Sequence, residues 1–131
     1  MTTYKCANEK DVKRHVRKLL DQHNWFWWMP PANAYGKSGI SDFHALRDGV
    51  FMVIETKFGK NKPTEPQKGF LGSVASMDGF AFVVNDTTLD HFSAWLHAFD
   101  RSVEAAQKNE MPAQEDGAEM VNMIRTLTQE Y

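Results

Sequence analysis

The chain has 131 residues, of which 24% are charged and 12% aromatic, and its formal net charge is −2. This composition is typical of one folded domain of modest size and excludes a disordered chain. The single cysteine, Cys6, excludes an internal disulfide and a cysteine-based zinc site, and the five histidines lack zinc-binding spacing. No apolar run is long enough to span a bilayer, and the polar start of the chain does not resemble a signal peptide. We therefore expect no membrane association and a cytoplasmic location, in a bacterial, phage-infected or other host cell.

Positive charge is concentrated in the first half of the chain. Residues 1–68 hold 12 Lys and Arg against 7 Asp and Glu, a net charge of +5, whereas residues 69–131 carry −7. A positively charged half favours a partner made of phosphates, such as DNA.

The first predicted element is a helix from Glu9 to about His23, capped by Asn8. Its apolar stripe at helical spacing consists of Val12, Val16, Leu19, Leu20 and His23. Glu9 falls on this stripe and is expected to face the sheet, although it would also complement the helix dipole there. Basic residues are expected on the other side, where they would be solvated or would contact phosphates: Lys10, Lys13, Arg14, Arg17 and Lys18.

Residues 24–29 are rich in tryptophan and are predicted to form a strand. A place in the middle of the fold would bury both of its faces, and a base-stacking platform is the alternative. The loop that follows contains Gly36, Lys37 and Ser38. It is not a phosphate-binding loop, because residue 31 is proline and no helix follows, so no nucleotide cofactor is expected. Lys37 is a candidate contact for a DNA phosphate.

A β-hairpin is predicted next, with strands at residues 42–46 and 50–54 joined by Asp48-Gly49. This turn places Asp42 opposite Glu55, with Lys57 on the same face of the sheet. Two opposed carboxylates repel each other, so they indicate a divalent cation, Mg²⁺ or Mn²⁺. The alternative is a solvated strand end at which Lys57 neutralises Glu55.

The second half of the chain is predicted to alternate helices and strands. Lys60 and Lys62 lie in a basic loop and are candidate phosphate contacts. Thr64 and Gln67 form a capping box that opens a helix, and a strand at residues 80–84 is expected to pair in parallel with the hairpin. Thr87 is predicted to cap a third helix, which ends near residue 108.

The order helix, three strands, helix, strand predicts an α/β fold with a mixed sheet flanked by helices. Residues 1–108 would form this domain. Residues 109–131 would add a linker and a C-terminal helix from residue 118 to the same domain.

The residues G39-I-S-D42, then V-I-E55-T-K57, then Gln67 resemble the VRR-NUC family of the PD-(D/E)XK nuclease superfamily. That family's pattern reads G-x-P-D, an apolar strand, E-V-K and S-x-x-Q. The resemblance covers about residues 8–85. It departs from the pattern outside the acidic positions, with serine in place of the proline before Asp42 and threonine in place of the serine before Gln67.

The resemblance implies a restriction-endonuclease-like core and a metal-dependent DNA endonuclease. It implies a homodimer that cuts branched DNA, such as Holliday junctions or flaps, and leaves a 5′-phosphate. The implied metal ligands are Asp42, Glu55, the carbonyl of Thr56 and, through water, Glu9. Lys57 and Gln67 complete the implied catalytic residues beside Asp42 and Glu55. The candidate DNA contacts are Lys13, Arg14, Arg17, Lys37, Lys60 and Lys62. The alternative is a catalytically silent DNA-binding or assembly module on the same fold.

Overall fold

The computed structural model describes residues 4–31 and 36–108. In these ranges the elements are α1 (Glu9–Gln22), β1 (Phe26–Trp28), β2 (Phe43–Arg47), β3 (Val50–Thr56), α2 (Glu65–Ser76), β4 (Phe80–Val84) and α3 (Leu89–Lys108). The predicted order of elements is confirmed up to α3. The chain divides into two compact units, Met1–His97 and Ala98–Tyr131, so the division falls within α3. The linker and helix predicted after residue 108 lie outside the described residues.

The four described strands form one open mixed sheet in the order β1-β2-β3-β4. The pairs β1–β2 and β2–β3 are antiparallel, and β4 is parallel to β3. A parallel pair requires a crossover connection, which α2 provides. The protein is therefore an α/β protein with helices on both faces of its sheet.

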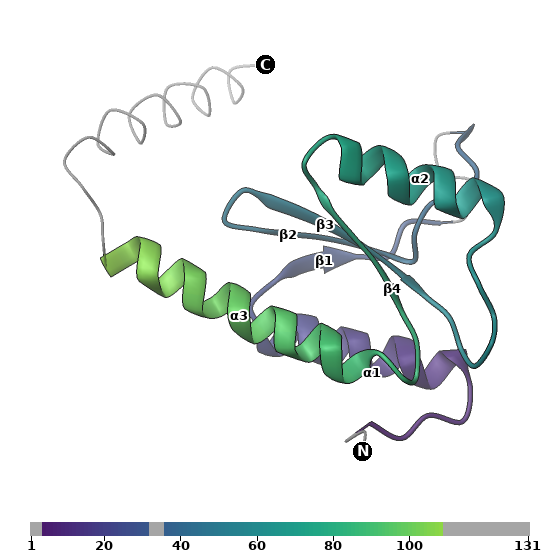
Figure 1. Cartoon of the computed structure of the whole chain (residues 1–131), viewed down its shortest axis with the longest axis horizontal. Coiled ribbons are helices and arrows are strands. Elements are labelled where there is room, and N and C mark those ends of the chain that lie inside the picture. The colour runs from purple at the N-terminus through teal and green to yellow at the C-terminus, as the bar shows by residue number, and fades with distance from the viewer. Residues whose placement is uncertain (1–3, 32–35, 109–131) are drawn as a thin grey trace. The chain divides into compact units, whose positions relative to one another are not determined.

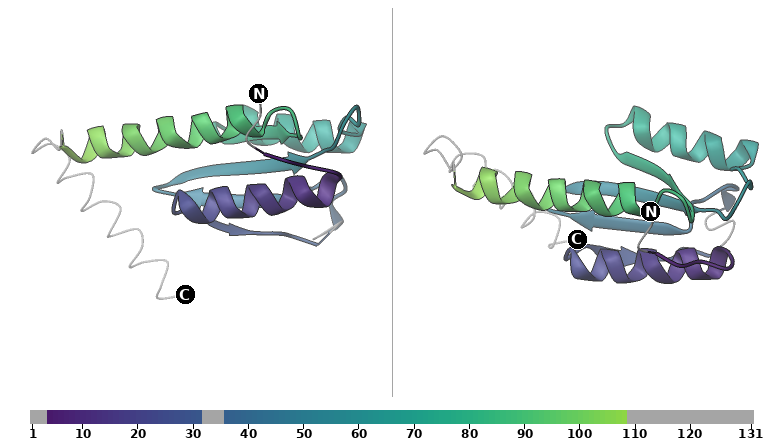
Figure 2. Two further views of the ribbon diagram at one scale, coloured as in Figure 1. Left: turned by 90° about the horizontal axis from the view of Figure 1, so that it is seen from below. Right: turned by 60° about the horizontal axis from the view of Figure 1, so that its bottom comes forward.

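The helices divide between the two faces of the sheet, as Figures 1 and 2 show. On one face, the ring of Phe82 packs against Phe92 and Trp95 in the first half of α3, at 5.6 and 4.9 Å between ring centroids. The amphipathic helix α1 covers the same face. On the opposite face, Phe70 of α2 stacks on His44 of β2 at 5.6 Å.

The core lies mainly between the sheet and the helices α1 and α3. Its fully buried side chains include Val12, Val16, Leu20, Phe43, Met52, Ile54, Leu89 and Leu96. Helix α2, in contrast, has no fully buried side chain. The α2 face of the sheet is therefore the less densely covered face, and it is the face that carries His44, Val53 and Glu55.

Strand β1 lies at the edge of the sheet, and the prediction that it is covered on both faces is wrong. The strand has three residues, and Phe26 and Trp28 are 69% and 38% exposed. Both project from the α2 face, where none of the described helices covers them. Only the neighbouring Trp25, 4% exposed, is buried as predicted.

The β2–β3 hairpin has the predicted turn and register. Asp48 and Gly49 have φ values of 50° and 81°, the left-handed conformation that a two-residue turn of this type requires. Arg47 pairs with Val50 and Phe43 pairs with Ile54. Continuing this register by one residue brings Asp42 to the level of Glu55.

Side chains cap the helices largely as predicted. The side chain of Asn8 accepts a hydrogen bond from the backbone of Asp11, and Thr64 and Gln67 form the capping box of α2. The cap predicted for α3 is wrong by one position. This helix begins at Leu89, and the hydroxyl of Thr87 instead bonds the side chain of Asn85. None of the helices in the described part of the chain combines the length and apolar character needed to cross a bilayer.

Candidate functional site

Acidic side chains from three elements meet at one end of the sheet. Glu55 and Thr56 end β3, Asp42 directly precedes β2, and Glu9 opens α1. Lys57 follows β3, where its backbone N–H bonds the carbonyl of Val84 in the parallel neighbour β4. The hairpin register and the parallel β3–β4 pairing therefore fix the backbone on which these side chains stand.

Thr56 holds one oxygen of Asp42 with two hydrogen bonds. The backbone N–H and the hydroxyl of Thr56 both donate to Asp42 Oδ2, at 2.8 and 2.7 Å. Two short bonds to one carboxylate oxygen fix the orientation of the whole group. The resemblance assigned Thr56 only a carbonyl ligand, so its side-chain role was missed. The signal was a hydroxyl where the family pattern has valine.

Glu55 is a buried carboxylate with only part of its bonding capacity used. It is 2% exposed; its Oε1 lies 3.7 Å from Lys57 Nζ, and its Oε2 has no hydrogen-bond partner among the described residues. The pKa of Glu55 is raised to about 7, chiefly by burial and then by the neighbouring carboxylate of Asp42. The ammonium of Lys57 and the backbone N–H of Asp42 oppose this rise in pKa. A buried, unpartnered carboxylate oxygen is costly, which indicates a missing cation or proton.

Lys13 lies inside the acidic cluster, contrary to its predicted place on the solvent-facing side of α1. Its Nζ lies 3.5 Å from Glu9 Oε2 and 3.7 Å from Asp42 Oδ1. The spacing between Glu9 and Lys13 explains this position. Residues four apart lie on the same face of a helix, and Glu9 was predicted to face the sheet. Glu9 does lie near the site, since its charge contributes to the raised pKa of Glu55.

Gln67 has the structural role that the capping box predicts. Its Oε1 accepts a hydrogen bond from the backbone of Thr64 at 2.9 Å, and its backbone N–H bonds the Thr64 hydroxyl. The loop before Asp42 lies directly against this helix start. A side chain at Gly39 would place its Cβ 2.3 Å from the carbonyl of Pro66 and 2.6 Å from the Gln67 nitrogen. Gly39 thus allows the Asp42 loop and the start of α2 to touch.

The remaining candidate DNA contacts lie at the surface. Arg14 pairs with Asp11 at 3.4 Å, and Arg17 reaches the sulfur of Met29 at 3.9 Å. Three lysines are exposed on loops, either two residues before Gly39 or shortly after the catalytic candidate Lys57: Lys37, Lys60 and Lys62. Their loops adjoin the acidic cluster in sequence. Within the described residues, none of these three ammonium groups forms an ion pair or a hydrogen bond.

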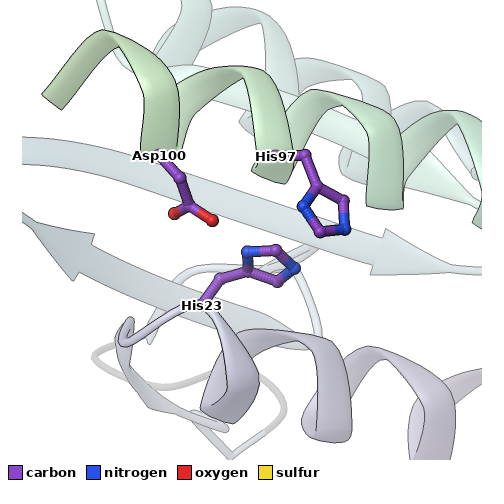
Figure 3. Close-up of side chains that lie close together, drawn as sticks. All are labelled: His23, His97 and Asp100. Carbon is purple, nitrogen blue, oxygen red and sulfur yellow. The ribbon is translucent and has the colours of Figure 1, made fainter. Parts of the chain in front are cut away.

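Two of the scattered histidines meet at the far end of α1. The rings of His23 and His97 pack edge to face at 4.5 Å between centroids (Figure 3). His23 is 6% exposed and is buried as predicted, although it is the C-cap residue of α1 and not part of the helix itself. A helix of 14 residues, about 21 Å long, separates His23 from Glu9, so this pair is not part of the acidic cluster.

The chain matches no protein-family model, and a search of curated proteins finds no significant relative. The chemistry of the cluster follows from its residues. Among the described residues, the hydrogen bonds to the Asp42 side chain go to Oδ2, and Glu55 Oε2 has no partner. The two carboxylates lie close enough to perturb each other electrostatically. Paired carboxylate oxygens are the ligands that Mg²⁺ and Mn²⁺ prefer. The residues fit a hard divalent cation.

Proposed function

We propose that the protein is a divalent-metal-dependent DNA endonuclease with a restriction-endonuclease-like core, related to the VRR-NUC family. The observation that carries the proposal is the juxtaposition of Asp42, the buried Glu55 and Lys57 at one sheet end. A solvated strand end would not bury Glu55 to 2% exposure and leave its Oε2 without a partner. A cation-binding centre accounts for both facts, because attraction to a metal ion offsets the free-energy cost of burying a carboxylate.

Asp42 and Glu55 would hold Mg²⁺ or Mn²⁺ in this proposal. The carbonyl of Thr56 would be a further ligand, and Glu9 would contribute through water. When bound, the metal supplies a water of lowered pKa and neutralises charge on the phosphate. Thr56 keeps the carboxylate of Asp42 in a fixed orientation, so the ligand set is prepared before the cation arrives.

Lys57 supplies the remaining chemistry. Its side chain is 14% exposed and its ammonium lies 3.7 Å from Glu55, so it is held beside the carboxylate with little freedom. A positive charge in this position orients the attacking water and stabilises charge that develops on the phosphate. Water attacks phosphorus, the bond to the 3′ oxygen breaks, and the 5′ end keeps the phosphate.

The proposed substrate is branched DNA, such as a four-way junction or a flap, bound by a homodimer. Two sites are needed to cut two strands of a junction, which is the physical reason for a dimer. Positive loops around the site, with Lys37, Lys60 and Lys62, would contact the sugar-phosphate backbone, which positions DNA without reading its sequence. We therefore expect selectivity for DNA structure instead of base sequence.

The test is cleavage of end-labelled four-way junction, flap, single-stranded and linear duplex DNA in Mg²⁺, Mn²⁺ or EDTA. Asp42→Asn and Lys57→Ala are the diagnostic variants. Lys108→Ala is the matched control, because Lys108 is exposed in the last turn of α3 and belongs to no candidate site. We expect metal-dependent cleavage that both diagnostic variants lose and the control keeps.

Persistent cleavage by either diagnostic variant would remove the assigned site. DNA binding without cleavage, by a folded protein and in either metal, would favour the catalytically silent DNA-binding module. Thermal unfolding of each variant separates lost activity from lost structure.

A further inference from the structure

The ammonium of Lys13 is shared between two carboxylates. Its distances to Glu9 Oε2 and Asp42 Oδ1, 3.5 and 3.7 Å, are both longer than a tight charge-assisted hydrogen bond of about 2.8 Å. Lys13 therefore balances the charge of both acids without being fixed to either one. Its side chain is 27% exposed, so its four-carbon stem has open solvent into which it can move.

The charges of the cluster show why such a group is present. Three carboxylates, those of Glu9, Asp42 and Glu55, face two ammonium groups. Lys57 pairs with Glu55, so Lys13 is the positive charge that serves Glu9 and Asp42. Without it, the mutual repulsion of the carboxylates would be opposed by Lys57 alone.

Lys13 also occupies the oxygen that a metal needs. Thr56 already holds Asp42 Oδ2 with two hydrogen bonds, which leaves Oδ1 as the oxygen available to a cation. Lys13 Nζ faces this oxygen. An ammonium and a divalent ion within about 4 Å of each other repel strongly in a partly buried site, so both cannot serve Oδ1 together.

We propose that Lys13 is the exchangeable counter-ion of the carboxylate cluster and leaves Asp42 Oδ1 when a divalent cation binds. This inference rests on the metal centre of the proposed function and assigns a positioning role to a residue outside its ligand set. A second feature also indicates a ligand and does not depend on how close the acidic residues are. The buried Oε2 of Glu55 has no partner among the described residues, Lys13 included. The exchange sets the metal affinity, because binding must displace a positive charge that the chain itself supplies.

The experiment measures Mn²⁺ binding to the DNA-free protein by electron paramagnetic resonance of the free ion. Lys13→Met removes the charge and keeps a side chain of similar length. Lys10→Met is the matched control, because it removes an equal charge from an exposed position in the first turn of the same helix. Lys13→Gln gives the same comparison if the methionine variant does not fold.

We expect Lys13→Met to bind Mn²⁺ about tenfold more tightly than the unmodified protein, because no resident cation must be displaced. The same variant should lose stability toward urea in EDTA and regain it with Mn²⁺. Lys10→Met should change neither quantity appreciably.

Equal or weaker Mn²⁺ binding by Lys13→Met would overturn the exchange, as would a protein that binds no Mn²⁺ at millimolar concentration. The failure of the proposed function looks different. Mn²⁺ binding that tightens on loss of Lys13, in a protein that cuts no DNA, would support the exchange and remove the nuclease.

Discussion

Thr56 donates both its backbone N–H and its hydroxyl to the same oxygen of Asp42. The two residues lie 14 positions apart, Asp42 just before β2 and Thr56 at the end of β3, so this link closes the end of the hairpin at the acidic cluster. It divides the carboxylate of Asp42 into one oxygen that is fixed by the protein and one that faces the cluster. This division makes Asp42 an oriented ligand instead of a mobile surface acid.

Removing the Thr56 hydroxyl should weaken metal binding more than it weakens the fold. Thr56→Val keeps the volume of the side chain and the backbone bond but loses the 2.7 Å bond to Asp42. Partners that orient a metal ligand typically affect metal affinity by about 10–100-fold, so we expect a loss of about tenfold. Mn²⁺ titration measures this effect, and Thr56→Ser, which restores the hydroxyl, should recover the affinity. Unchanged affinity in Thr56→Val would show that Asp42 is oriented without this bond.

Gly39 and Gly36 offer a matched pair of substitutions for the contact between the Asp42 loop and α2. Both have left-handed φ values, 77° and 73°, so alanine at either position costs about 1–2 kcal/mol of backbone strain. At Gly39 the new Cβ would collide with backbone, 2.3 Å from Pro66, whereas at Gly36 it would have no described atom within 4 Å. Overpacking of this kind adds about 1–3 kcal/mol.

We therefore expect Gly39→Ala to be destabilised by clearly more than Gly36→Ala in urea unfolding, and to lose Mn²⁺ affinity as the loop shifts. Equal losses of unfolding free energy in the two variants would contradict the close approach of the loop to α2.

The hairpin was predictable in detail, because Asp48-Gly49 strongly favours a two-residue turn and such a turn fixes every pair up to Asp42. The exposure of β1 was not predictable. A run of aromatic residues favours a strand but does not indicate whether a neighbour pairs with it, and here the sheet ends at β1. Phe26 and Trp28 are therefore exposed in the described structure, although their hydrophobicity suggested that they would lie in the core.

Lys13 was misplaced for a different reason. Its charge favoured a position facing solvent, whereas its spacing from Glu9 favoured a position near the sheet. The prediction followed the charge. The i, i+4 relation to Glu9 places Lys13 on the edge of the helix that faces the sheet. A lysine can lie there when its ammonium group pairs with carboxylates, as it does with Glu9 and Asp42. The part of the site formed by Asp42 and Glu55 was predictable, because the register of a hairpin is set by its own turn. The positions of Glu9 and Lys13 depend on how α1 packs against the sheet, which the local sequence does not determine.

Gln67 should show two separable roles. Its Oε1 caps α2, and its amide nitrogen has no part in the capping box. Gln67→Glu keeps the capping oxygen, so its unfolding free energy should stay within about 0.5 kcal/mol, whereas Gln67→Ala should lose about 1 kcal/mol. If the amide nitrogen serves the proposed nuclease, both variants lose cleavage by about tenfold or more, since removed transition-state contacts act on the rate. Full activity in the stable Gln67→Glu variant would restrict Gln67 to capping.

The raised pKa of Glu55 predicts the pH dependence of stability in the metal-free protein. Its folded-state pKa of about 7 lies above the ordinary value of 4.5, so folding favours the protonated form. This contribution is fully present below about pH 4.5 and is lost as pH rises through about 7. In EDTA, the unmodified protein should therefore lose stability relative to Glu55→Gln between about pH 5 and pH 8, by on the order of 2 kcal/mol. Urea unfolding of both proteins across this range measures the difference.

Divalent metal should reverse the trend, because a cation favours the ionised carboxylate. With Mn²⁺ in excess, the unmodified protein should gain stability as pH rises from about 5 to 8, and Glu55→Gln should gain much less. The two proteins share every other titrating group, so their difference isolates Glu55. A metal-free difference that stays constant across the range would mean that Glu55 titrates normally in the folded protein. The carboxylate would then be solvated, and the burial on which the metal centre rests would be wrong.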